Sequence, residues 1–120
     1  MKPQAGVGRT ELTPYWGVEL TGWGYYLERT WLDVRDPLFA TALVVDNGRC
    51  SWAVISLDLM LLSASFTADV REQVAAATDI PAKNILVCCT HTHNAPASGG
   101  LLGVGEVDPF YESWAAKQSA

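Results

Sequence analysis

Two apolar segments separated by an Asn-Gly pair are the feature that most constrains how this chain folds. Residues 38–46 and 51–58 are rich in β-branched and aromatic residues, and Asn47-Gly48 lies in the short connection between them. Asn-Gly is a frequent hairpin turn because both residues tolerate positive φ angles. We therefore expect the two segments to pair as antiparallel strands. The second segment is apolar enough to be a central strand of a sheet.

A helix and a third apolar segment follow this hairpin. Ser63 and Ser65 are both candidate N-caps of a helix that runs to about Ala77, because apolar residues recur through it at helical spacing. Pro81 stops the helix, and residues 85–89 form the next strand. A strand, a helix and a second strand in this order form a right-handed parallel crossover. The fold class is therefore α/β, with a mixed sheet that contains a β-hairpin and a βαβ crossover.

The two ends of the chain add a strand and a helix. Residues 5–12 are expected to form a short strand, which ends at Thr13-Pro14 because the residue before a proline avoids the helical region. Asp108-Pro109 is typical of a helix start, and the helix that it predicts reaches the end of the sequence without a glycine or proline stop. We therefore expect residues 1–120 to be the amino-terminal portion of a larger α/β catalytic domain.

Residues 15–37 form a long connection that is rich in glycine and aromatic residues. Connections of this length in a compact domain are usually functional or packed against another element. One interpretation is therefore a non-catalytic α/β interaction module in which this connection binds a partner chain, since exposed apolar patches mark such contacts.

The composition excludes several classes of protein. Hydrophobic residues make up 49% of the chain and charged residues 18%, which is typical of a folded domain and not of a disordered chain. The net charge of -5 and the scattered Lys and Arg residues argue against a nucleic-acid partner, which needs a basic patch. No apolar leader follows Lys2, and no segment reaches the roughly 18 apolar residues of a membrane span. The chain as written is expected to be cytoplasmic, and secretion of a longer parent protein stays open.

The only two histidines of the chain, His91 and His93, directly follow the third apolar segment. If the extended geometry of that strand persists, side-chain alternation sends both imidazoles to the same face at its carboxyl end. Ligands gather at that end of α/β sheets, and neutral imidazole is a good zinc ligand. A catalytic zinc ion needs about three protein ligands and an open position, so the pair predicts half of a metal site.

Two further residues are candidates, each with a structural alternative. Cys89 shares the expected face of His91 and His93, and its thiolate would complete the site of a small metal-binding protein, although a cysteine in such a run is usually a small buried hydrophobe. Asp58 ends the strand beside the proposed site. It is either a carboxylate that holds an imidazole N–H behind the metal or a cap of the turn over residues 59–63.

Five segments, taken together and in this order, resemble the amino-terminal catalytic domain of the neutral/alkaline, non-lysosomal ceramidase family. They are residues 5–14, 22–24, 35–38, 56–58 and 89–93. The resemblance implies a zinc amidase that cleaves the N-acyl bond of ceramide to a sphingoid base and a fatty acid. It also implies one zinc ion held by two histidines, a glutamate and a tyrosine.

Carried over residue by residue, the resemblance implies that His91 is a zinc ligand. It implies that His93 faces the substrate and helps to stabilise the reacting carbonyl group. The remaining ligands would lie beyond Ala120. A lipid amide substrate also implies peripheral contact with a membrane. The chain departs from the family at residues 94–96, where Asn-Ala-Pro stands in place of Ser-Gly-Pro, and the identity of the substrate is therefore open.

Overall fold

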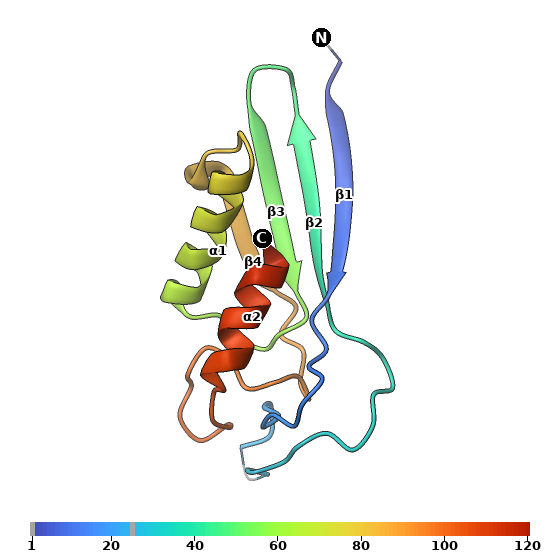
Figure 1. Ribbon diagram of the computed structural model, residues 1–120, viewed down its shortest axis with the longest axis vertical. Helices are drawn as coiled ribbons and strands as arrows, with labels where there is room; N and C mark the ends of the chain where they lie inside the picture. The colour runs from blue at the N-terminus through green and yellow to red at the C-terminus, as the bar shows by residue number, and fades with distance from the viewer. Residues whose placement is uncertain (1, 25) are drawn as a thin grey trace.

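The structure is a computed structural model that describes residues 2–24 and 26–120. In this part of the chain four strands form one sheet in the order β1-β2-β3-β4 (Figure 1). The first three strands pair antiparallel, and β3 pairs parallel with β4. The fold class expected from the sequence is confirmed. The strands are β1 (Gln4–Glu11), β2 (Phe39–Asp46), β3 (Ser51–Leu57) and β4 (Ile85–Cys89).

The expected hairpin joins β2 to β3. The side chain of Asn47 closes the four-residue turn, because its Oδ1 accepts hydrogen bonds from the backbone N–H groups of Arg49 and Cys50, both at 2.9 Å. Gly48 has a φ of 81°, a conformation that glycine adopts without steric cost. The central position predicted for β3 is also confirmed, since β2 lies on one side of it and β4 on the other.

Helix α1 (Ala64–Ala77) connects β3 to β4. Ser63, not Ser65, is its N-cap, because the Ser63 hydroxyl accepts a hydrogen bond from the backbone N–H of Phe66 at 3.1 Å. The helix ends at Ala77 as expected. A short 3-10 helix, η1 (Ala82–Asn84), then leads into β4, and the sequence pattern did not predict it.

The core lies between the sheet and the two helices, α1 and α2 (Pro109–Ser119), which cover the same face (Figure 1). Alternate residues of β3 point into this core, and the helices contribute apolar residues at helical spacing. Side chains that point to the opposite face of the sheet, such as Val7, Trp52 and Leu86, are exposed. The buried residues that β3 and the helices contribute are Ala53, Ile55, Leu57, Phe66, Val70, Val74, Tyr111, Ala115 and Ala116.

Part of the aromatic connection over residues 15–37 packs on helix α2. The ring of Trp16 meets those of Tyr111 and Trp114 edge-on, with centroid distances of 6.3 and 5.9 Å. The indole N–H of Trp31 donates to the backbone carbonyl of Trp16 at 3.1 Å. Tyr25 of this connection lies outside the described residues. The contacts show that α2 anchors the first half of the connection.

No helix of the described residues has both the length and the hydropathy to cross a bilayer.

We predict that Tyr111→Phe lowers the free energy of unfolding by about 1–3 kcal/mol. The hydroxyl of Tyr111 is buried and donates to the backbone carbonyl of Leu12 at 2.8 Å, and removing it leaves that carbonyl without this donor. Burial also raises the pKa of Tyr111, so the hydroxyl stays protonated in the folded state. Urea unfolding followed by tryptophan fluorescence measures the change.

Tyr15→Phe is the matched control for this prediction. The side chain of Tyr15 is 84% exposed, so its replacement is expected to change the free energy of unfolding by less than about 0.5 kcal/mol. Equal effects of the two substitutions would contradict the role given to the Tyr111 hydroxyl.

Candidate active site

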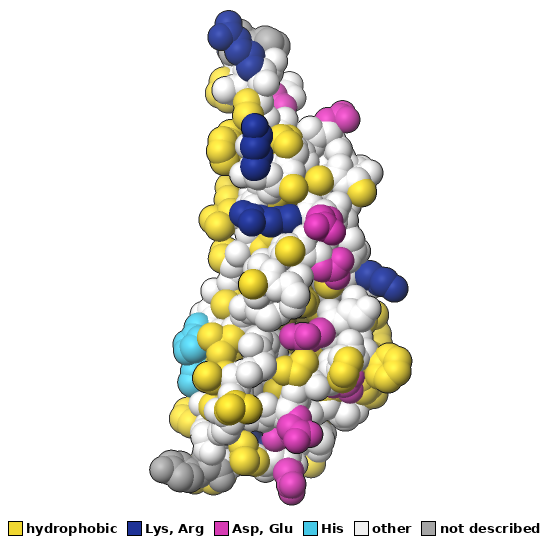
Figure 2. All heavy atoms as spheres, turned by 90° about the vertical axis from the view of Figure 1, so that its left-hand side faces the viewer, with side chains coloured by type: hydrophobic (Ala, Val, Ile, Leu, Met, Phe, Trp, Pro, Cys, Tyr) yellow, Lys and Arg dark blue, Asp and Glu magenta, His cyan; other side chains and the backbone are white. Residues whose placement is uncertain are grey.

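His91 and His93 lie at the surface just beyond the carboxyl end of β4 (Figure 2). The expectation that extended geometry persists through them is wrong, because His91 has a φ of 62°. The backbone N–H groups of Thr90 and Thr92 bond to the carbonyls of Leu57 and Leu59 at 2.9 and 3.1 Å, which holds the segment against the chain that follows β3. The two imidazole rings still meet edge-on, with centroids 5.0 Å apart.

One nitrogen of the His91 ring is fixed by the backbone. Its Nδ1 lies 2.9 Å from the carbonyl oxygen of Met60. A carbonyl oxygen only accepts hydrogen bonds, so Nδ1 carries the proton in the neutral ring and Nε2 keeps its lone pair. A histidine whose other ring nitrogen donates to a backbone carbonyl is the usual arrangement of a metal ligand. His91 therefore fits one position in the coordination sphere of a metal ion.

The His93 ring is held by the aromatic connection. Trp23 meets it edge-on with centroids 5.3 Å apart. Gly22 lies directly behind it with a φ of 112°, and a Cβ atom at that position would come within 2.8 Å of the imidazole. A glycine is therefore required at residue 22 for His93 to keep this place. The sequence indicated residues 22–24 only as one of the segments that resemble the ceramidase family, and it did not predict their contact with His93.

Asn94 joins this connection to the histidine segment. Its Oδ1 accepts hydrogen bonds from the indole N–H of Trp23 at 2.9 Å and from Nη1 of Arg29 at 3.0 Å. Its φ of 65° lies in the left-handed region, which asparagine tolerates better than most residues. Sequence reasoning missed Arg29 as a residue of the site. The only signal at Asn94 was its departure from the family pattern.

Asp58 connects three strands of the sheet. Its carboxylate accepts hydrogen bonds from the backbone N–H of Phe39 at 2.9 Å and from the hydroxyl of Thr90 at 3.3 Å. These partners belong to the start of β2 and the segment after β4. Within the described residues, no hydrogen bond joins Asp58 to either imidazole. Its contacts thus differ from both roles that the sequence left open.

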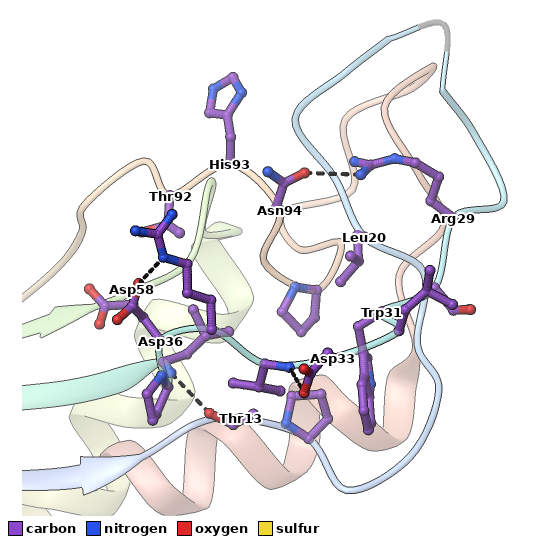
Figure 3. A pocket seen from close by; sticks show the side chains of 18 residues that line it. Thr13, Leu20, Arg29, Trp31, Asp33, Asp36, Asp58, Thr92, His93 and Asn94 are labelled. Carbon is purple, nitrogen blue, oxygen red and sulfur yellow. Dashed lines mark hydrogen bonds and ion pairs between the residues drawn. The ribbon is translucent and has the colours of Figure 1, made fainter.

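His93 and Asp58 both line an open pocket of about 900 Å³ (Figure 3). Arg29, Asn94 and His93 lie together along one wall, while Asp33, Asp36 and Asp58 lie along the others. His91 is not among the lining residues. The apolar part of the lining consists of Pro14, Leu20, Trp31, Leu32, Val34, Pro37, Leu38 and Pro96.

The described residues contain no group of three or more His, Cys, Asp or Glu side chains placed to hold a metal ion. The alternative site built from Cys89, His91 and His93 is therefore not formed. Cys89 instead donates its S–H to the Met60 carbonyl at 3.3 Å, beside the hydrogen bond from His91. The chain offers His91 as one fitting ligand, and a complete zinc site needs further ligands from elsewhere.

Comparison with known proteins gives matches only among solved structures. No family model matches the sequence, and no curated protein matches it. The structure is similar to neutral ceramidase from Pseudomonas aeruginosa, with a TM-score of 0.80 and 20% identity over 97% of this chain. It is also similar to a ceramidase complexed with C2, with a TM-score of 0.69 and 20% identity over 80% of this chain.

The chain spans only part of these proteins, because the matches cover 20% and 16% of the two ceramidase chains. At 20% sequence identity, the match shows that the folds are similar and does not show that the chemistry is the same. The resemblance seen in the sequence is therefore matched at the level of the fold: the chain has the fold of one part of a neutral ceramidase.

Proposed function

We propose that this chain supplies part of the active site of a zinc-dependent hydrolase. The reaction is cleavage of the N-acyl bond of ceramide, which gives a sphingoid base and a fatty acid, or of the same bond in a related lipid amide. The observation that carries the proposal is the bond from His91 Nδ1 to the Met60 carbonyl, which leaves Nε2 free beside a pocket that His93 lines. The likeness to ceramidase structures supports it.

In this proposal residues 1–120 are the amino-terminal portion of a longer catalytic domain. Nε2 of His91 would hold the zinc ion together with a histidine, a glutamate and a tyrosine from outside this chain. When bound, zinc lowers the pKa of its water ligand and polarises the amide carbonyl. The Met60 carbonyl keeps the His91 ring in one orientation and one tautomer.

His93 would act on the substrate rather than on the metal. His93 is one of the residues that line the pocket, and its ring is held between Trp23 and the backbone of Gly22, so its position is set before a ligand enters. An imidazole N–H in this place would donate to the amide oxygen as negative charge develops on it. The apolar lining between Leu20 and Leu38 would contact the acyl chain.

We predict that the 120-residue chain binds zinc weakly and that His91→Ala lowers this affinity by about tenfold or more. The chain provides one well-oriented ligand, so most of the binding free energy of a four-ligand site is missing. Titration calorimetry with zinc chloride measures the affinity. Cys89→Ala is the control, since its thiol bonds to Met60 and is expected to leave zinc affinity unchanged. Tight binding that is lost in Cys89→Ala would instead support a small metal-binding protein.

We also predict that the 120-residue chain alone does not hydrolyse ceramide, because it would supply only one of the ligands that a water-activating zinc ion needs. Release of fatty acid from a labelled short-chain ceramide is the measurement. Turnover that depends on zinc and disappears in both His91→Ala and His93→Ala would show that this chain holds a complete site, and would overturn the proposal that it supplies only a part.

A non-catalytic interaction module is a second candidate, because the connection over residues 15–37 exposes apolar side chains. Tyr15, Tyr26 and Leu32 are all more than half exposed. Such residues mark protein contacts when they form a continuous patch. The variant His91→Ala distinguishes the two functions. It is expected to lower zinc affinity if the chain is part of a hydrolase, and to leave partner binding unchanged if the chain is an interaction module.

A further inference from the structure

Arg29 carries a charge that no carboxylate of the described residues neutralises. Its Nη1 donates to the amide oxygen of Asn94 and its Nε to the backbone carbonyl of Tyr26 at 3.3 Å, and both acceptors are neutral. Nη2 is buried and has no hydrogen-bond partner in the part of the chain that the structure describes. The single ion pair found there joins Arg35 to Asp36. A buried donor without a partner destabilises the folded state, and an anion would offset this cost.

The acidic residues of the same pocket lie away from Arg29 and are engaged elsewhere. In Figure 3 the Arg29 guanidinium points to Asn94 on the wall that carries His93, and Asp36 and Asp58 lie on the far side. Asp36 is paired with Arg35, and Asp58 accepts hydrogen bonds from Phe39 and Thr90. The pocket is therefore polarised. An anionic group would be attracted to the Arg29 end and repelled from the other.

The neutral bridge through Asn94 keeps this cation in place. Asn94 Oδ1 bonds to both Arg29 and Trp23, and Trp23 contacts the His93 ring. One side chain thus ties the guanidinium to the same cluster that holds the imidazole. Because the acceptor is a neutral amide and not a carboxylate, Arg29 is held in place with no opposite charge to neutralise its own.

We propose that Arg29 is an anion-recognition residue and that the ligand of this pocket is an acyl amide with a carboxylate near the amide bond, as in an N-acyl amino acid. The proposal rests on the proposed function for the place of His93 and narrows its substrate class, since ceramide carries no such charge. Hydrolysis adds water across the amide C–N bond, so the products are a fatty acid and a free amino acid. The apolar lining receives the acyl chain, and the carboxylate lies at Arg29.

The test is a comparison of two probes that differ only in charge, N-octanoylglycine and its neutral amide, N-octanoylglycinamide. Binding to the 120-residue chain without zinc is followed by the NMR shift of the Trp23 indole N–H, which donates to Asn94. We expect the carboxylate to bind about tenfold or more tightly than the amide. Equal affinity of the wild-type chain for the two probes would overturn the proposal, whatever the variants do.

Variants at two arginines of the pocket locate the charge. Arg29→Gln is expected to remove the preference for the carboxylate, and Arg29→Lys to keep part of it, because lysine retains the charge without the planar fork. Arg35→Gln is the matched control: Arg35 lines the same pocket but is paired with Asp36 and almost fully exposed, so the preference is expected to stay. If the preference for the carboxylate survived in Arg29→Gln and disappeared in Arg35→Gln, the anion would be bound by Arg35, and the proposal for Arg29 would be wrong.

The test of the anion site can succeed or fail independently of the test of the zinc site. A chain that prefers the carboxylate through Arg29 but shows no zinc affinity dependent on His91 would keep the anion site and reject the hydrolase. The reverse outcome would keep the zinc ligand and reject the substrate class.

Discussion

The parallel pairing of β3 with β4 determines where the two histidines of the candidate site lie. It brings the carboxyl ends of the two strands together, and Leu57 opposite Cys89 is the last pair of the ladder. Beyond it the backbone contacts continue, because Thr90 and Thr92 bond to the carbonyls of Leu57 and Leu59. Met60 consequently lies beside His91, and the carboxyl edge of the sheet, where α/β proteins bind ligands, carries both histidines.

The backbone carbonyl of Met60 connects the packed core of the fold to the candidate site. It accepts hydrogen bonds from His91 and Cys89, so a buried backbone group sets the tautomer of an exposed imidazole. The positive φ of His91 is the conformational cost of this arrangement. On the other side of His93, the connection through Gly22, Trp23 and Arg29 closes one wall of the pocket. Helix α2 secures that connection through Trp16.

Local features of the fold could be predicted from the sequence because their causes are local. The Asn47 turn, the Ser63 cap and the Asp108 cap each depend on a side chain bonding to backbone within a few residues. The crossover followed from two apolar segments and the helical pattern between them. The pairing partner of β1 and the short helix η1 were not predicted, because the first is a long-range contact and the second has no periodic signal.

The candidate site could be predicted from the sequence only in part. The residue type and the position after a strand indicated His91 and His93. Their rings do lie together, but not through the side-chain alternation of an extended strand, because His91 has a positive φ angle. Met60 lies 31 residues from His91 and Arg29 lies 65 residues from Asn94, so no periodicity could pair them. The same limit applies to Asp58, whose main partner is a backbone amide of another strand and not an imidazole.

The state of the His91 ring tests the central claim most directly. Two-bond ¹H–¹⁵N correlation spectra of the 120-residue chain distinguish the two tautomers of a neutral imidazole. The hydrogen bond to Met60 predicts that Nδ1 carries the proton and that Nε2 is the free nitrogen, ready for a metal ion. A ring with the proton on Nε2 would contradict this account, because Nε2 of His91 would then have no lone pair to offer a zinc ion.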